Sequence, residues 1–144
     1  MPDTVAEGAA MDIAEINRRV IGQFRAGGPI EGMDRNRLLL LSTTGRRTGL
    51  PRTTPMMFER DGEDLIVIAS NVGAPKHPDW YLNLAAHPEV TVEVGDERFE
   101  AVAETTSGAR RERLWAMLKR RYPFFADHEA KTTREIPVVV LTRM

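Results

Sequence analysis

Three arginines and a threonine gather around one glycine-flanked turn of the chain. Arg46, Arg47 and Thr48 lie between two glycines, and Arg52 follows shortly after them. A planar guanidinium group binds phosphate or carboxylate oxygens in pairs, which a lysine ammonium cannot do. Turns also bring backbone N–H groups together in a way that suits anionic oxygens. The pattern indicates an anion-binding turn, and a solvated basic hairpin is the alternative that the residues leave open.

A second loop rich in turn-forming residues follows in the same domain. The segment from Ala69 to Lys76 contains Ser70, Asn71, a glycine and a proline. No Gly-x-Ser-x-Gly elbow surrounds Ser70, so we expect it to donate a hydrogen bond to a ligand rather than to act as a nucleophile. Two such loops on one small domain predict a ligand with an anionic tail.

The histidines and the absence of cysteine argue against a metal site. His77 lies on a polar loop beside Lys76 and Pro78, and we expect it to be exposed to solvent. His77, His87 and His128 show no short spacing of the kind that zinc ligands use. Without cysteine, the chain has no thiolate ligand, disulfide or cysteine nucleophile. We therefore predict that no metal is bound.

Aromatic side chains cluster at two points and suit a flat ligand. Trp80 and Tyr81 are consecutive in a predicted helix, so we expect one in the core and the other beside a pocket. The run Tyr122-Pro123-Phe124-Phe125 either seals the core or forms an apolar wall for a flat ring. A flat, phosphorylated cofactor would satisfy the aromatic and the basic groups together, because it supplies the reactivity while the protein positions it.

Length, charge and hydropathy describe one ordinary globular domain. The chain has 144 residues, a formal net charge of −1 and 42% hydrophobic residues. Its overall charge provides no attraction to nucleic acid or to an anionic membrane. No apolar run approaches the roughly 20 residues of a membrane span, and the acidic N-terminus does not resemble a secretory signal. We expect a cytoplasmic protein, with membrane association as the alternative.

The periodicities predict a mainly β, α+β domain with six antiparallel strands. Residues 1–10 are expected to be loose, and apolar residues at helical spacing predict a helix over residues 11–25. Apolar runs predict strands at residues 38–43, 52–60, 65–69, 90–94, 99–103 and 138–141. Helices are expected from Pro78 to His87 and from Ser107 to the break at Pro123. Short turns between the strands favour a small closed or split β-barrel over residues 31–144, preceded by an N-terminal tail and helix over residues 1–30.

Several stretches of sequence resemble the deazaflavin-dependent nitroreductase family. The first is Leu-Leu-Ser-Thr-Thr-Gly-Arg-Arg-Thr-Gly-Leu-Pro-Arg from Leu40 to Arg52. The others are Ala-Ser-Asn-Val-Gly, His-Pro-Asp-Trp-Tyr-Leu-Asn-Leu and the closing Arg-Glu-Ile-Pro-Val-Val-Val. The likeness runs from about residue 35 to residue 144. It implies coenzyme F420 as the cofactor, in a six-stranded split β-barrel with flanking helices that is related to the FMN-binding barrels.

The resemblance implies a cofactor site that extends from the basic turn to the second loop. Arg46, Arg47 and Thr48 would contact the phosphate and polyglutamate tail, while Ser70 and Asn71 would lie beside the deazaflavin ring. The implied cofactor-binding residues are Arg46, Arg47, Thr48, Arg52, Thr53, Thr54, Pro55, Met56, Met57, Ile68, Ala69, Ser70, Asn71, Asp79, Trp80, Tyr81, Leu82, Asn83 and Phe125. Ser70 and Tyr122 are the predicted catalytic residues, because their hydroxyl groups could polarise the hydride acceptor.

Departures from the family pattern bear on the substrate. Met57, Phe125 and His128 stand where some relatives have tyrosine, and Asn71 stands where they have lysine. The implied reaction is hydride transfer from reduced F420 to an electron-poor small molecule, namely a quinone, an enone or a nitroarene. The missing hydroxyl groups favour a quinone or enone. An FMN-dependent oxidase of the same barrel type and a non-catalytic F420 carrier are the alternative functions.

Partners beyond the small-molecule substrate remain open at the level of sequence. The helix over residues 11–25 is expected to pack on the core, and a mobile lid or an anchor for peripheral membrane contact is the alternative. A homodimer is a further alternative to a single chain. Nucleic acid is not expected to bind.

Overall fold

A long helix precedes the rest of the fold in the computed structural model, which describes the backbone of residues 2–144 and the side chains of residues 13–144. This helix, α1 (Pro2–Ala26), ends at Gly27, whose φ of +82° cannot continue a right-handed helix. The helix extends back to Pro2, beyond the predicted start at residue 11. Alanines in this segment favour a helix on propensity alone, without an apolar stripe to reveal it.

Seven strands within residues 2–144 form a single antiparallel sheet. They are β1 (Leu38–Thr44), β2 (Pro51–Met57), β3 (Glu59–Asp61), β4 (Asp64–Ile68), β5 (Glu89–Val94), β6 (Glu97–Thr105) and β7 (Val138–Arg143). Their spatial order is β2-β1-β5-β6-β7-β4-β3, and each neighbouring pair is antiparallel. The predicted count of six strands is wrong, because the expected strand over residues 52–60 breaks into β2 and β3.

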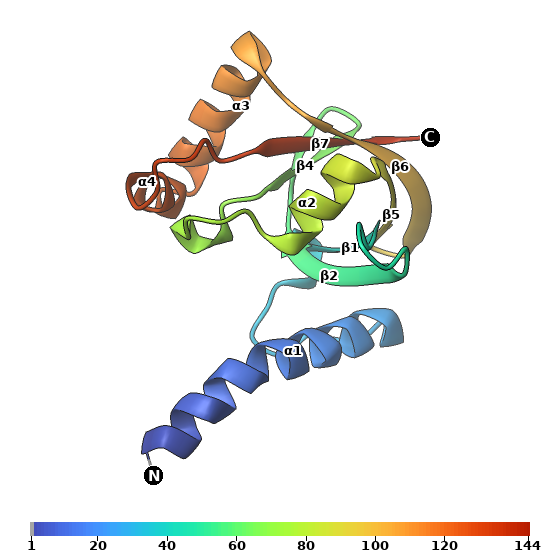
Figure 1. Ribbon diagram of the computed structural model, residues 1–144. Helices are drawn as coiled ribbons and strands as arrows, with labels where there is room; N and C mark the ends of the chain where they lie inside the picture. Colours follow the sequence, from blue (N-terminus) through green and yellow to red (C-terminus); the bar gives the residue numbers. More distant parts are fainter. Residues whose placement is uncertain (1) are drawn as a thin grey trace.

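The sheet curls because its two edge strands are consecutive in the chain. β2 and β3 lie at opposite ends of the strand order, yet only Phe58 separates them. Phe58 is buried, and its N–H donates to the Arg37 carbonyl oxygen at 3.3 Å. One residue spans only about 3.5 Å, so the two edges must approach each other. The result is a half-barrel with flanking helices, which confirms the α+β class (Figure 1).

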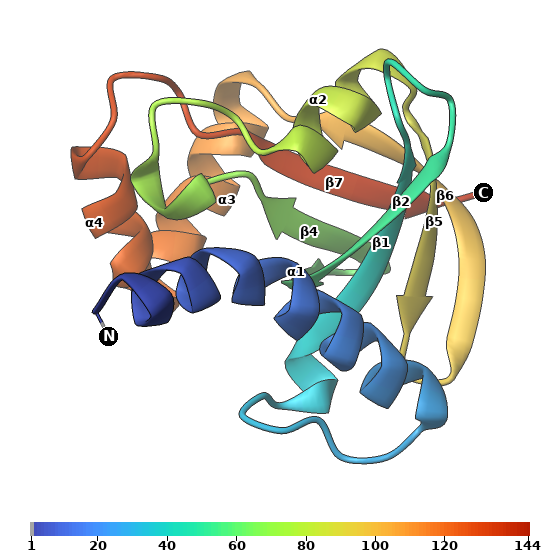
Figure 2. The ribbon, with the colours of Figure 1, turned by 60° about the horizontal axis from the view of Figure 1, so that its bottom comes forward.

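Strand β1 is covered on both faces, which explains its continuous apolar run. Leu39 and Leu41 lie in the core inside the half-barrel. Leu38 and Leu40 face the opposite way and pack against α1 through Val20. Figure 2 shows α1 lying across β1 and β2. The C-terminal part of the helix therefore packs on the barrel core, as the sequence predicts, whereas Ile13 and Ile16 are exposed.

An ion pair adds a polar attachment at the end of α1. Arg25 donates from Nε and Nη2 to the two carboxylate oxygens of Glu93 on β5, at 3.0 and 2.9 Å. The hydrogen bond from Arg25 is the main cause of a lowered Glu93 pKa and of a raised Arg25 pKa. Because Glu93 is buried, this pairing also satisfies a carboxylate that water cannot reach well.

Shorter helices close one end and one outer face of the barrel. α2 (Asp79–Ala86) lies across one mouth, whereas α3 (Gly108–Arg121) and α4 (Phe124–Ala130) lie together outside β4 and β7 (Figure 1). The start of α2 after Pro78 is confirmed, but α4, which follows Pro123 at once, was not predicted. Two 3-10 turns, η1 (Arg35–Arg37) and η2 (Asn71–Gly73), precede β1 and follow β4. Within the described residues, no helix combines the length and apolar character needed to cross a membrane.

Candidate functional site

The turn between β1 and β2 is held in one conformation by its own backbone. The Gly45 N–H donates to the Leu50 carbonyl at 2.8 Å, and the Gly49 N–H donates to the Gly45 carbonyl at 2.8 Å. Gly49 has a φ of +72°, a left-handed conformation that glycine adopts without strain. A Cβ atom at residue 45 would lie 2.6 Å from the Thr48 hydroxyl oxygen, so this position has room only for glycine. The turn thus presents its arginines in a defined place.

Arg46 ties this turn to α2. Its backbone N–H and its Nη1 both donate to Asn83 Oδ1, at 3.1 and 2.9 Å, and its Nη2 lies 3.2 Å from Asp79 Oδ1. Asn83 is only 5% exposed and donates onward to the Thr43 hydroxyl at 3.4 Å. A buried amide needs such partners. Part of the Arg46 charge is therefore used to hold the hairpin against the helix.

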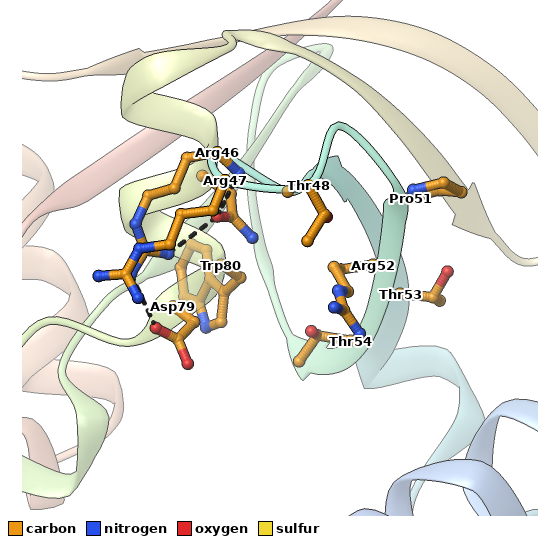
Figure 3. A pocket seen from close by; sticks show the side chains of 11 residues that line it. Arg46, Arg47, Thr48, Pro51, Arg52, Thr53, Thr54, Asp79 and Trp80 are labelled. Carbon is orange, nitrogen blue, oxygen red and sulfur yellow. Dashed lines mark hydrogen bonds and ion pairs between the residues drawn. The ribbon is translucent and has the colours of Figure 1, made fainter.

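The turn, β2 and α2 surround an open cavity of about 680 Å³. Its lining combines basic, hydroxyl and aromatic groups, from Gly45, Arg46, Arg47, Thr48, Pro51, Arg52, Thr53, Thr54, Asp79, Trp80 and Asn83. Figure 3 shows Arg46 and Arg47 on the side of Asp79, with Arg52 across the cavity on β2. Among the described residues, neither Arg47 nor Arg52 has an ion-pair or side-chain hydrogen-bond partner. Their guanidinium groups are available to anionic oxygens.

The cavity unites only part of the predicted cofactor site. Gly45 and Pro51 line it and were missed, although the glycine flank of the basic turn was a usable signal. The other predicted cofactor-binding residues do not line this cavity: they are Pro55, Met56, Met57, Ile68, Ala69, Ser70, Asn71, Tyr81, Leu82 and Phe125. The structure therefore separates a basic section around the turn from a second section at the end of β4.

Some of these other residues are packed into the core inside the half-barrel, or into an outer apolar cluster where α3 and α4 cover β4 and β7. Phe125 is 3% exposed, and its ring centroid lies 5.8 Å from that of Trp115. Met57 packs against the same outer cluster, whereas Met56 packs against the core inside the barrel. The hydroxyl group of Tyr81 lies 3.0 Å from the Thr105 hydroxyl. Phe125 does not reach the open cavity, and its role in binding stays a prediction.

The loop after β4 packs closely on α4. Ser70 is 7% exposed, and its Oγ lies 3.1 Å from His128 Nδ1. Asn71 and Val72 have φ values of +47° and +57°, a left-handed conformation that a β-branched residue rarely adopts. A Cβ atom on Gly73 would lie 2.6 Å from the His128 carbonyl oxygen. Tertiary contacts, rather than local preference, therefore hold this loop in shape.

His77 is half-buried, so the prediction that it is exposed is wrong. Its ring centroid lies 4.9 Å from that of Tyr81, and its Nδ1 lies 3.0 Å from Nη1 of Arg134. Burial, together with the positive charge of Arg134, lowers the pKa of His77. The sequence could not reveal this environment, because Arg134 is 57 positions away along the chain.

Tyr122, the other predicted catalytic residue, lines a separate cavity of about 480 Å³. Its hydroxyl donates to Glu59 Oε2 at 2.9 Å, and Arg121 lies 3.2 Å from the same oxygen. Burial and the hydrogen bond to Glu59 raise the pKa of Tyr122, so the phenol stays protonated at neutral pH. Burial opposes ionisation of Glu59, but hydrogen bonds from Arg60, Tyr122 and Arg121 together hold its pKa below the usual value.

The first cavity offers binding groups rather than an acid–base pair. Trp80 provides an aromatic surface, while Arg47 and Arg52 provide charge for anionic oxygens. Within the part of the chain that the structure describes, no three His, Cys, Asp or Glu residues are grouped to hold a metal ion. Such a site suits a ligand that brings its own reactivity.

Known proteins with similar sequences share this architecture and a common cofactor. Residues 12–143 match the family model of F420H2-dependent quinone reductases. An F420H2-dependent quinone reductase of Mycobacterium tuberculosis is 41% identical over 108 residues, which cover 73% of this chain and 72% of that protein.

Two solved structures extend the likeness to three dimensions. One is an F420H2-dependent reductase, 35% identical with a TM-score of 0.67, covering 78% of this chain and 99% of that one. The other is described as a domain-swapped dimer, 31% identical with a TM-score of 0.69, covering 98% of this chain and 99% of that one. The resemblance to deazaflavin-dependent reductases is thereby confirmed, with coenzyme F420 as the cofactor. The chain belongs to the F420H2-dependent quinone reductase family.

Proposed function

We propose that this protein transfers a hydride from reduced coenzyme F420 to a quinone, and that the cavity beside the β1–β2 turn binds the anionic tail of the cofactor. One observation carries the proposal. Arg47 and Arg52 face this cavity with no ion-pair partner among the described residues. Their charge is available for several anionic groups, and F420 has more of these than FMN. This difference favours F420 over the alternative of an FMN-dependent oxidase.

The residues divide the cofactor between two sections of the protein. Arg47, Arg52 and the Thr48 hydroxyl would hold the phosphate and tail, while Arg46 keeps the turn docked on α2. Ser70 and Asn71 would lie beside the ring, at the end of β4. When bound, the reduced deazaflavin supplies the hydride. The protein's own contribution is to orient the two reactants and to exclude water around them.

Ser70 is the stronger of the two proposed catalytic hydroxyls. It lies in the loop proposed to face the ring, and its hydrogen bond to His128 fixes the direction of the side chain. In the histidine tautomer whose Nδ1 donates to Ser70 Oγ, the serine hydroxyl proton is free to be donated to the hydride acceptor. The Tyr122 hydroxyl is a protonated donor, but it already donates to Glu59 in the second cavity. For Tyr122 to polarise a quinone oxygen, this hydrogen bond must first be exchanged for one to the substrate.

A titration with F420 and FMN side by side tests the cofactor, and oxidation of F420H2 by a simple benzoquinone tests the reaction. We expect tighter binding of F420 and quinone-dependent loss of F420H2 absorbance. Equal or tighter binding of FMN would contradict the cofactor assignment. Tight binding of F420 with no turnover on quinone, enone or nitroarene would instead support the carrier alternative.

We also propose that the protein forms a homodimer, with the N-terminal unit over residues 1–30 separable from the barrel over residues 31–144. The relative described as a domain-swapped dimer supports this proposal. So does the connection after α1, where Gly27 and Gly32 have φ values of +82° and +77° and allow alternative paths of the chain. Light scattering over a range of concentrations tests it. A monomer at every concentration would exclude the dimer.

A further inference from the structure

The guanidinium group of Arg134 contacts both ends of the loop between β4 and α2. Arg134 lies in the connection between α4 and β7, which runs beside this loop in Figure 2. Its Nε donates to the Ala74 carbonyl at 2.9 Å, its Nη1 to the Ala69 carbonyl at 3.1 Å and its Nη2 to the Ser70 carbonyl at 2.7 Å. Nη1 also lies 3.0 Å from His77 Nδ1. All three nitrogens of the side chain are used within residues 69–77.

These contacts include no carboxylate. Among the described residues, Arg134 has no ion-pair partner, and carbonyl oxygens with one imidazole nitrogen surround its charge. Arg134 is half-buried, and this burial lowers its pKa. A planar fork with several fixed donors can bind carbonyls in different directions at once, whereas an ammonium cannot match that geometry.

The loop that Arg134 holds would not keep its shape unaided. Asn71 and Val72 adopt left-handed conformations, which cost free energy for residues other than glycine and persist only where surrounding contacts impose them. The loop's own side-chain contact, from Asn71 Nδ2 to the Lys76 carbonyl at 3.0 Å, joins only its two halves. Arg134 links both halves to the barrel, because it bonds Ala69 at the end of β4 as well as Ala74.

We propose that Arg134 is a positioning residue for hydride transfer. Its guanidinium group holds residues 69–77 in the conformation that presents Ser70 and Asn71 to the ring of the cofactor. The proposal rests on the proposed function, since it assumes that this loop faces F420. Its expected effect appears in the use of F420H2 rather than in the affinity for the quinone.

The test compares Arg134→Ala and Arg134→Lys with Arg35→Ala. Arg35 is a matched control, because it is also half-buried, its Nη1 and Nη2 donate to the backbone carbonyls of Gly28 and Phe24, and neither of these lies in the loop. We expect Arg134→Ala to lower kcat/KM for F420H2 by about 10- to 100-fold, the range that misplaced reacting groups produce. Arg134→Lys should lose less of its kcat/KM for F420H2. Millimolar guanidinium ion, added to the assay, should partly restore kcat/KM in Arg134→Ala. Arg35→Ala should be less stable, with kcat/KM for F420H2 unchanged.

Several outcomes would overturn the positioning role. An Arg134→Ala variant with wild-type kcat/KM for F420H2, measured well below its unfolding temperature, would do so. An equal loss in Arg35→Ala would also do so, because it would assign the effect to general stability. If Arg134→Ala does not fold, Arg134→Lys decides, and wild-type kinetics in that variant contradict the proposal. Failure of the proposed function is distinct, since wild-type protein would then neither bind F420 nor oxidise F420H2.

Discussion

The two loops that the sequence marks as ligand-binding behave differently in the fold. The turn between β1 and β2 leaves Arg47 and Arg52 without partners among the described residues, in an open cavity. The loop after β4 uses the side chains of Ser70 and Asn71 and several of its carbonyls internally, in bonds to Arg134, His128 and its own backbone. One loop offers charge to a ligand, whereas the other offers a fixed shape.

This difference assigns the affinity for the cofactor to one loop and the orientation of its ring to the other. Groups that are unpaired in the protein can contribute binding free energy to an anion, but they impose little orientation on a ring. A loop fixed by internal contacts does the reverse, because its hydrogen bonds are already satisfied. Substitutions in the turn should therefore alter cofactor affinity, and substitutions around the second loop should alter stability and turnover.

The largest expected effect is on stability, at the contact between the second loop and α4. Gly73→Ala places a Cβ atom 2.6 Å from the His128 carbonyl oxygen, at a φ of +81°. We expect the free energy of unfolding to fall by about 3 kcal/mol. Gly62→Ala is the control, because Gly62 has a φ of +63° with open space around it, and about 1 kcal/mol is expected there. Urea denaturation measures both. Equal losses would show that the loop does not depend on close packing.

The next effect concerns the turn and is on binding. Arg47→Ala combined with Arg52→Ala should weaken F420 binding by about 2 kcal/mol, or about 30-fold, with little change in stability. The salt dependence of binding should become shallower as well. Arg113→Ala combined with Arg120→Ala on α3 removes the same charge far from the cavity and is the control. Similar losses in both double variants would assign the effect to net charge, and the turn would be a solvated hairpin.

Arg46 should show a mixed behaviour, because it is the one arginine of the turn with internal partners among the residues that the structure describes. Arg46→Ala leaves Asn83 Oδ1 with only the backbone donor, so we expect a stability loss of about 1 kcal/mol in addition to weaker F420 binding. Arg47→Ala should leave the unfolding temperature unchanged. Thermal unfolding without cofactor separates the two. If both variants unfold at the wild-type temperature, the hydrogen bonds from the Arg46 side chain to α2 do not contribute to the stability of the fold.

The smallest expected effect is a dependence of the second loop on pH. The pKa of His77 is lower in the folded protein than its ordinary 6.5, so the unfolded chain binds this proton more readily. The stability contributed by neutral His77 is complete above that pH and is lost as the pH falls below it. His77→Asn, whose amide oxygen can still accept from Arg134, should flatten this part of the stability curve as the pH falls through 6.5. An unaltered curve in this variant would exclude His77 as the group that titrates.

Local signals in the sequence determined most of the secondary structure and the basic turn. Alternating and continuous apolar runs marked the strands, Pro78 marked the start of α2, and Asp61-Gly62 marked the turn into β4. The predicted basic turn also proved to line a cavity. These features depend on residues a few positions apart, so their physical causes are visible in the chain itself.

Only the tertiary structure decided how the sheet curls into a half-barrel and which polar groups are hydrogen-bonded within the protein. The break at Phe58 arises because the curled sheet needs one strand at each edge, which no local pattern encodes. Contacts between residues 57 to 65 positions apart hold His77, Ser70 and Ala69 around Arg134. Glu59 likewise accepts a hydrogen bond from the Tyr122 hydroxyl across 63 positions of the chain. The sequence by itself determined which chemical groups this protein has, and folding decided which of them remain available to a ligand, because a long-range contact satisfies a polar group that looks free along the chain.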